Sequence, residues 1–432
     1  MALLAQRIAK IGTENAFKVG PCIREVEQAG HKVIKCNLGE PDFPLAEHIR
    51  EEVKAQLDAD NTHYCDPQGI LPLRTAIANH FSRTRGLSIT PDRVVVFPGA
   101  KPPIGFCQHA YLEEGDEVIY PSPGFPIYES FAGYVGAVPV PMHLPEDNGF
   151  AIGGKDLAAL ITKRTKLIIL NFPSNPTGGV ASKEQLSELA EVILSRSGDD
   201  VRVYSDEVYE DILFDGAKHC SIASLPGMER RTVIVSGASK SFAWTGGRVG
   251  WAAFPTAQEA AVFKTLNINY FSCVPAYNQE GARVGLESPR SAPCIAKMVS
   301  AFQERRDVVV SGLNKIEGVK CQKPRGAFYV FPNISGLCER LGAFRAFESL
   351  PEGVRKQTSP STLVQMFLLF RFHVATMDRR SFGQIGSEGR HFLRISIATG
   401  IDDLREALRR IENAANDKKG FAEFIAKGGR LF

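Results

Sequence analysis

The sequence predicts an α/β fold in which helices flank a mainly parallel sheet and a smaller α+β domain follows. Between residues 45 and 289, short apolar runs alternate with amphipathic helical stretches. The runs are unbroken, as expected of parallel strands that are buried on both faces. After residue 289, a long charged helical stretch and a separate strand follow. We therefore expect an N-terminal arm with part of the small domain at 1–44, a large domain at 45–289, and a small C-terminal domain at 290–432.

Four apolar runs are predicted to be strands of the large domain. Between the second and third of them, Ser182 followed by Gln185 forms a capping box, and apolar residues then repeat at helical spacing up to Ile193. This part of the chain therefore reads as strand, crossover helix, strand. The four predicted strands are 94–97, 167–170, 201–204 and 233–235.

In the C-terminal third, the pattern predicts a charged helix at about 302–313, a strand at GAFYVF (326–331) and a final helix from Asp402. The most apolar stretch, LVQMFLLF at 363–370, is shorter than the ~20 residues that a membrane span requires. We expect it to be a buried helix or strand.

Charge and cysteine content exclude several classes of protein. The formal net charge is +3, and the charges are scattered, so neither nucleic acid nor a membrane surface is expected as a partner. The opening MALLAQRIAKIG is too short in apolar residues for a secretory signal and is expected to be an amphipathic arm. Nine cysteines without a CxxC pair suit reduced thiols and a cytoplasmic location, and no metal site is predicted.

Polar, glycine-rich segments follow each of the four predicted strands. In an open parallel sheet, ligands bind beyond the carboxyl ends of the strands, so these segments are expected to converge on one site. They are PGAK at 98–101, NFPSNPTGG at 171–179, SDEVY at 205–209 and SGASK at 236–240.

Lys240 is the most informative residue of these segments. A lysine buried just past a strand among small neighbours can have a lowered pKa and form an imine with an aldehyde. An isolated Ser-Lys pair is more often a surface turn. The motifs around Lys240 argue against that alternative.

Taken in order, these motifs make the chain resemble the class I aminotransferases, which are fold type I enzymes that use pyridoxal 5'-phosphate (PLP). Each motif is weak alone, whereas their order and separation are specific. Those quoted for the resemblance are NLGEPDF (37–43), Tyr64, PGAK, SPGF (122–125), NPTG (175–178), DEVY (206–209), SGASK, GGRVGW (246–251), ERRD (304–307), GAFY (326–329) and LRIS (393–396).

The resemblance implies that an amino acid passes its amino group to a 2-oxo acid through a pyridoxamine form of the cofactor. It makes Lys240 the Schiff-base lysine and the base that moves the proton from the substrate Cα. Asp206 is expected to pair with the pyridine nitrogen and keep it protonated, which makes the ring a better electron sink. Asn175 and Tyr209 are expected to hydrogen-bond the phenolic oxygen of the cofactor.

The resemblance also assigns the phosphate and the ring face. Arg248, Ser239 and the backbone N–H groups of Gly99 and Ala100, where a helix is expected to begin, would hold the phosphate. Phe125 would stack on the pyridine ring.

For the substrate, Arg394 matches the arginine that binds the α-carboxylate through two parallel bonds, assisted by Asn175 and the backbone at Leu38 and Gly39. Lys101 matches a lysine that meets the distal carboxylate of dicarboxylic substrates. The resemblance thus implies aspartate as leading donor and 2-oxoglutarate as one acceptor. The alternative for Lys101 is that it adds positive charge near the phosphate or faces solvent.

Tyr64 matches a tyrosine that reaches the phosphate of the neighbouring subunit, which implies a homodimer with shared sites. Three departures from the family pattern stand out. Gly247 replaces a common Trp, the segment 373–383 lacks the Pro-Gly usually found before its Phe-Gly turn, and the stretch 335–372 has no alignable motif.

Other functions remain open at this stage. The same cofactor serves C–S β-lyases, decarboxylases and cyclopropane-forming synthases, since fold does not fix reaction. Phe125 and Tyr128 could instead shape a pocket for aromatic or aliphatic donors. A regulator with a DNA-binding domain is disfavoured because the motifs begin at Asn37, and a nicotinamide enzyme because no GxGxxG follows a strand.

Overall fold

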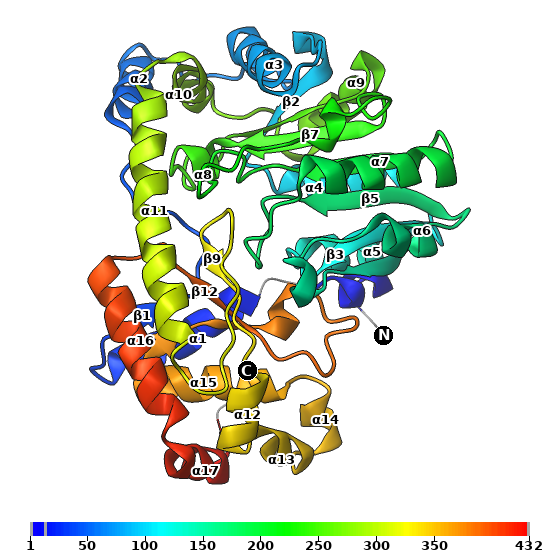
Figure 1. Cartoon of the computed structure of the whole chain (residues 1–432). Helices are drawn as coiled ribbons and strands as arrows, with labels where there is room; N and C mark the ends of the chain where they lie inside the picture. Colours follow the sequence, from blue (N-terminus) through cyan, green and yellow to red (C-terminus); the bar gives the residue numbers. More distant parts are fainter. Residues whose placement is uncertain (1–2, 13–14, 430–432) are drawn as a thin grey trace.

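Within residues 3–12 and 15–429, which the computed structural model describes, the largest sheet has seven strands in the order β2-β8-β7-β6-β5-β3-β4 (Figure 1). Neighbours from β7 to β4 run parallel, and β8 is antiparallel to both β7 and β2. The predicted mainly parallel sheet is therefore confirmed. Its strands are β2 Val94–Phe97, β3 Glu117–Ser122, β4 Val138–His143, β5 Thr165–Asn171, β6 Arg202–Asp206, β7 Thr232–Gly237 and β8 Gly250–Ala253.

The four strands predicted from the sequence are β2, β5, β6 and β7, each within two residues of the expected ends. Strand β8 was not predicted. Its sequence, GWAA, contains no β-branched residue, so local preference does not mark it as a strand. It forms because both of its edges pair, with β2 on one side and β7 on the other.

Helices cover both faces of this sheet, as the side chains of β5 show, because they point alternately to one face and the other. Leu167 and Ile169 pack in one cluster with α4, α5 and α9, whereas Ile168 and Leu170 pack on the other face in a cluster with α7. Burial on both faces explains why the strand sequences are apolar without interruption. The α-helices between residue 15 and residue 287 are α1 Asn15–Gln28, α2 Glu47–Asp58, α3 Leu71–Arg85, α4 Pro102–Tyr111, α5 Ile127–Val135, α6 Gly154–Leu160, α7 Lys183–Arg196, α8 Ala238–Ser241, α9 Ala257–Tyr270 and α10 Ala276–Glu287.

The rest of the chain forms two small sheets and a helical layer. Strands β11, β12 and β9 form an antiparallel sheet, and β1 pairs in parallel with β10. These strands are β1 Ile34–Lys35, β9 Tyr329–Val330, β10 Val374–Ala375, β11 Met377–Asp378 and β12 Leu393–Ser396. The helices are α11 Ser291–Leu313, α12 Ser335–Leu341, α13 Ala343–Glu348, α14 Glu352–Arg355, α15 Pro360–Phe372, α16 Ile401–Ala415 and α17 Lys418–Ala426.

Helix α11 runs along one side of both parts of the molecule (Figure 1). The helix predicted at 302–313 is its C-terminal half. The apolar run 363–370 lies in α15 and is almost entirely buried, and the final predicted helix is α16. The predicted smaller α+β part is therefore present, while its exact boundaries at residues 44 and 289 stay predictions.

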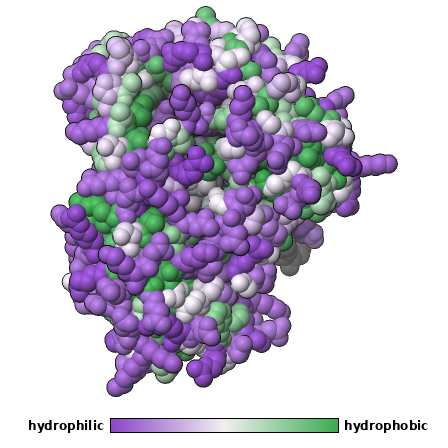
Figure 2. All heavy atoms as spheres, viewed as in Figure 1, coloured by the Kyte–Doolittle hydropathy of each residue, from purple (hydrophilic) through white to green (hydrophobic). Residues whose placement is uncertain are grey.

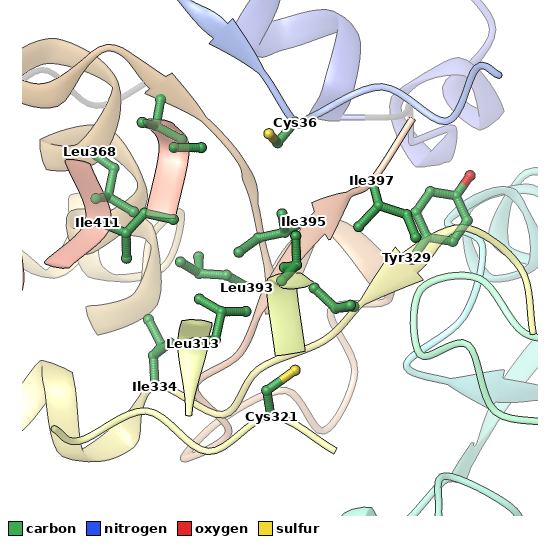
Figure 3. Packing of buried hydrophobic residues seen from close by; sticks show 14 of the residues in the cluster. Cys36, Leu313, Cys321, Tyr329, Ile334, Leu368, Leu393, Ile395, Ile397 and Ile411 are labelled. Atoms are coloured by element: carbon green, nitrogen blue, oxygen red, sulfur yellow. The ribbon is translucent and has the colours of Figure 1, made fainter. Parts of the chain in front are cut away.

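A hydrophobic cluster holds this smaller part together (Figure 3). It contains Ile34 and Cys36 from the N-terminal segment beside residues from α11, α15 and α16. Tyr329 lies at the edge of this cluster, and its hydroxyl points away from it (Figure 3). The cluster thus fixes the ring of Tyr329 and leaves the hydroxyl for contacts elsewhere.

The predicted capping box is present at α7, where the Ser182 hydroxyl accepts from the Gln185 amide and the Gln185 side chain accepts from Ser182. Hydrophilic residues predominate on the face shown in Figure 2, with apolar residues in separate patches. Across the described ranges, no helix has both the length and the apolar character needed to cross a membrane.

Candidate active site

A cavity of about 500 Å³ lies beyond the carboxyl ends of β5, β6 and β7. All four predicted polar segments contribute to its wall, so the expected convergence of strand ends is observed. Gly99 and Tyr64 are outside the wall, and no residue of the unaligned stretch 335–372 contributes to it. The predicted residues that line the cavity are Leu38, Gly39, Ala100, Lys101, Phe125, Asn175, Asp206, Tyr209, Ser239, Lys240, Arg248 and Arg394.

Lys240 projects into the cavity from α8, the short helix that follows β7. Its Nζ donates a 2.5 Å hydrogen bond to the carbonyl of Gly39 and lies 5.9 Å from the centroid of the Tyr209 ring. Gly39 must be glycine here, because a Cβ would overlap the hydroxyl of Tyr329. The backbone at Gly39 therefore lies directly against the amine of Lys240.

Asp206 ends β6 and is buried. The Tyr128 hydroxyl donates to its Oδ2 at 2.6 Å. Burial raises the pKa of Asp206 to about 6, although the Tyr128 hydrogen bond and the charge of Lys240 act in the opposite direction. A cation placed beside this carboxyl group would lower its pKa and favour the ionised form further.

Tyr209 and Tyr329 form a buried pair of phenols. Their hydroxyl oxygens are 2.8 Å apart, and their rings pack edge to face. Burial and the neighbouring Tyr329 raise the pKa of Tyr209 well above its ordinary value, so Tyr209 is a neutral hydrogen-bond donor.

Arg394, in β12, is 5% exposed and held from four directions. Its Nη1 donates to Asn175 Oδ1 at 3.0 Å, and its Nη2 donates to the carbonyl of Asn37 at 2.5 Å. Its Cζ lies 4.5 Å from the centroid of the Tyr329 ring and 4.7 Å from that of Phe382. The guanidinium plane is therefore fixed in the wall of the cavity, and the predicted proximity of Asn175 is observed.

Arg248 reaches the cavity beside the loop that follows β2. Its Nη1 donates to Thr245 O at 2.7 Å and its Nη2 to Pro98 O at 3.1 Å. A Cβ at Gly99 would overlap this guanidinium, so the glycine permits the approach. The Gly99 N–H donates to the Phe97 carbonyl at 2.7 Å, so it does not point into the cavity as expected.

Two further predictions concern this loop, namely the start of a helix after it and the place of Lys101. Helix α4 begins at Pro102, directly after Ala100 and Lys101, as predicted. Lys101 Nζ lies 5.5 Å from the centroid of the Phe125 ring, inside the cavity wall. Lys101 is also exposed, so both its proposed contact with a distal carboxylate and the alternative that it adds charge near the phosphate or faces solvent stay predictions.

A buried cluster of charges supports the DEVY segment from behind. Arg85, in α3, contacts Glu207 Oε2 at 2.7 Å and Glu210 Oε2 at 2.5 Å. Burial opposes ionisation of Glu207, yet Arg85 and His219 lower its pKa to about 2. Glu207 directly follows Asp206 and Glu210 directly follows Tyr209, so the cluster anchors the segment that carries both. Sequence reasoning gave no role to these charges.

Comparison with known proteins decides the family. A family model described as Aminotransferase class I and II matches residues 31–411. The chain belongs to the class I and II aminotransferase family. It is 34% identical, over 96% of its length and 99% of the relative, to a probable aspartate/prephenate aminotransferase of Aquifex aeolicus.

Two further members of this family are similar to the chain. One is aromatic-amino-acid aminotransferase 2 of Thermococcus litoralis, with 34% identity over 91% of this chain and 95% of the relative. The other is the crystal structure of the aspartate aminotransferase from Rhizobium meliloti. It has a TM-score of 0.85 and 31% identity and covers 96% of this chain and 99% of that one.

Enzymes of this family use PLP, and this chain is a PLP-dependent aminotransferase. The residues of the cavity fit the cofactor. Lys240 supplies a primary amine, the buried Asp206 calls for a cationic partner such as a protonated pyridine, and Arg248 supplies a cation for a phosphate. At Gly99, the missing Cβ leaves the space in which that cation lies.

Several residues of the cavity wall were missed or had no assigned role in the sequence analysis. Tyr329 lies in the quoted GAFY motif, which was the available signal. Tyr128 was considered only as a possible part of a side-chain pocket. Met377, Ser381 and Phe382 come from the segment that departs from the family pattern, so no motif pointed to them.

Proposed function

We propose that Lys240 carries PLP and that Asp206 pairs with the pyridine nitrogen of the cofactor. Asn175 and Tyr209 would bond the ring oxygen, and Arg248 with Ser239 would bind the phosphate. When bound, PLP supplies an aldehyde that joins to primary amines and a ring that draws electrons from the substrate Cα. The observation that carries this proposal is the convergence of these side chains on one cavity with the amine of Lys240.

Two groups of the chain act on the amino acid itself. Arg394 binds the α-carboxylate, and its fixed guanidinium orients the substrate as well as holding it. Lys240 Nζ is the base that takes the proton from the substrate Cα. The close cover provided by the Gly39 loop and Tyr329 limits water around this amine, which strengthens the electrostatic interactions in the site.

We propose aspartate as the leading donor and 2-oxoglutarate as one acceptor. A second carboxylate entering a partly desolvated site costs several kcal/mol unless a cation meets it. Lys101 lines the same cavity as Arg394 and can supply that cation. Relatives named aspartate aminotransferase, from Rhizobium meliloti and Geobacillus stearothermophilus, support this choice.

An aromatic donor is the second candidate. The cavity wall includes Phe125, Tyr329 and Phe382, which offer apolar surface to a ring. The Thermococcus litoralis relative is named for aromatic amino acids. A panel of amino acids tested against several 2-oxo acids distinguishes the two candidates, because an aromatic enzyme would turn over phenylalanine at least as well as aspartate.

Lys101→Ala is expected to lower kcat/KM for aspartate by ~10-fold or more, equivalent to ~1.4 kcal/mol of transition-state binding. The reason is that the distal carboxylate loses its cation. Turnover of alanine and phenylalanine should change little, since neither has a second carboxylate. Steady-state kinetics with the three donors measure the effect. An equal loss with all three would mean that Lys101 serves the cofactor and does not select the substrate.

We also propose a cytoplasmic homodimer with shared active sites. Tyr64 is 87% exposed and lies outside the cavity of its own chain, as a residue that reaches a partner would. Near the end of α9, the side chains of Tyr270 and Ile268 are 59% and 50% exposed, and they add apolar surface. The nine cysteines are free thiols, which supports a reducing compartment.

Tyr64→Phe is expected to weaken PLP retention by ~10-fold or more, since one hydrogen bond to a charged group contributes ~1.5–3 kcal/mol. Dialysis of the holoenzyme, followed by absorbance of the remaining cofactor, measures retention. The thermal unfolding temperature of the apoprotein should not change, because the exposed Tyr64 hydroxyl makes no internal contact that folding needs. A fully active monomer at high dilution would contradict the shared site.

A further inference from the structure

The turn before Gly383 is built differently from the usual family pattern. It lacks the Pro-Gly noted above and carries Asp378 and Arg379 instead. Asp378 caps the turn, because its Oδ1 accepts from the Ser381 N–H at 3.1 Å and from the Ser381 hydroxyl at 2.5 Å. Ser381 and Phe382, at the end of the turn, line the active-site cavity. The departure therefore lies in the wall of the site.

Arg379 is a buried cation, 1% exposed, that is bonded to neutral groups. Its Nη1 donates to the carbonyls of Phe382 at 3.2 Å and Gly383 at 2.8 Å, and its Nη2 donates to the Ser122 hydroxyl at 2.8 Å. It forms no ion pair with any residue in the described ranges. Burial, and then the charge of Arg390, lower its pKa to about 10. The carboxylates of Glu129 and Asp378 raise that pKa without forming a salt bridge to the guanidinium, so its hydrogen bonds go to the turn carbonyls and to Ser122. A buried cation held in this way costs desolvation energy that its neutral partners offset only in part.

The turn is joined to the segment 122–129, from the end of β3 to the first turn of α5, by contacts besides Arg379. The Gly124 N–H donates to the Phe382 carbonyl at 3.0 Å, the same oxygen that Arg379 binds. The Glu129 carboxylate accepts from the N–H groups of Gln384 at 3.0 Å and Ile385 at 3.3 Å. The same segment carries Phe125 in the cavity wall, so Arg379 links two parts of the wall of one site.

The far side of the turn touches the carboxylate-binding arginine. The Phe382 ring lies 4.7 Å from Arg394 Cζ and, with Tyr329, encloses the guanidinium between two aromatic faces. A shift of Phe382 would release one face of that guanidinium. The orientation of Arg394 therefore depends on a turn whose carbonyl groups Arg379 holds.

We propose that Arg379 is a positioning residue for substrate binding, which braces Phe382 against Arg394 by tying the turn 379–383 to Ser122. This proposal rests on the proposed role of Arg394 as the α-carboxylate site. Arg379 acts through Phe382 and does not line the cavity itself. Both substrates of a transamination carry an α-carboxylate, so both are expected to depend on the brace.

Arg379→Met and Ser122→Ala test the brace, with Arg380→Met as matched control. Arg380 is the adjacent arginine, and among the residues that the structure describes it bonds the carbonyls of Thr358 and Lys356. In the PLP-loaded enzyme, the two test variants should raise KM for donor and acceptor by about 10-fold, the equivalent of ~1.4 kcal/mol from one charge-assisted hydrogen bond. The kcat and the cofactor absorbance spectrum should change little. Ser122→Ala keeps Arg379 and removes only the hydroxyl that accepts from its Nη2. This variant therefore tests the brace even if Arg379→Met does not fold.

Calorimetric titration with maleate, a dicarboxylate without an amino group, adds a measurement that does not depend on turnover. We expect weaker maleate binding in Arg379→Met and Ser122→Ala, and wild-type binding in Arg380→Met. Wild-type KM and maleate affinity in both test variants would overturn the brace, as would an equal loss in Arg380→Met. Arg394→Met separates this from a failure of the proposed function. If that variant binds maleate like the wild type, the carboxylate site itself is wrong and the brace falls with it.

Discussion

Lys240→Ala is expected to lower the transamination rate by about 10⁴-fold, because positioned proton transfer alone contributes ~10²–10⁴-fold and the covalent attachment is lost as well. Lys240 lies in α8, directly after β7, and its Nζ lines the cavity and donates to the Gly39 carbonyl. Of the two lysines that line the cavity, Lys240 is the one whose charge acts on Asp206. Single-turnover kinetics with the PLP-reconstituted variant measure the loss.

Borohydride reduction followed by peptide mapping gives an independent measurement of the same assignment. The wild type should carry the reduced cofactor on Lys240. Lys183→Ala, an exposed lysine at the start of α7, should keep full activity and labelling. Label on another lysine, or full turnover in Lys240→Ala, would show that the assignment is wrong.

The parallel strands could be predicted because burial on both faces leaves a local trace in the sequence. Every residue of β2 and β7 is buried, and each strand contains an unbroken apolar run, at 94–97 in β2 and 233–235 in β7. Strand β8 is also buried, but its GWAA sequence has no β-branched residue, and one of its two partners, β2, lies far away along the chain. Its antiparallel direction is likewise decided by long-range pairing and not by local preference.

The candidate site could be predicted where it follows strand ends. Parallel topology brings the carboxyl ends of β5, β6 and β7 to one edge, so residues after them must meet. Phe382 and Tyr329 lie on the opposite wall and come from the part of the chain that closes over this edge. Which of their faces meets Arg394 is set by the packing of β9, β11 and β12, and no spacing in the sequence encodes that contact.

The direction of the Gly99 N–H could not be predicted from the sequence. A glycine-rich turn before a helix suggests N–H groups that face an anion. Here the turn closes on itself, since the Gly99 N–H donates to Phe97 O. The role that the structure supports for this glycine is steric, because it makes room for Arg248. Both roles require a glycine, so residue identity alone could not separate them.

Asp206→Asn is expected to lower kcat by ~10²-fold or more, the usual loss when one preorganised group of a catalytic site is removed. The reason is that an amide cannot hold the ring nitrogen protonated. Burial raises the pKa of Asp206 to about 6 against the effects of Tyr128 and Lys240, and a cationic ring beside it would lower that pKa again. PLP binding is then coupled to loss of a proton from Asp206. Cofactor affinity should therefore fall as the pH drops below about 6.

Titration of PLP affinity from about pH 5 to 8 measures this coupling, with a limiting slope of about 10-fold per pH unit for one proton. The cofactor phosphate also titrates near pH ~6, so the wild type has to be compared with Asp206→Asn, which keeps the phosphate and lacks the carboxyl group. We expect the wild type to lose affinity more steeply than the variant on the acid side. Equal slopes in the two proteins would mean that Asp206 exchanges no proton when PLP binds, and the pairing with the ring nitrogen would then be wrong.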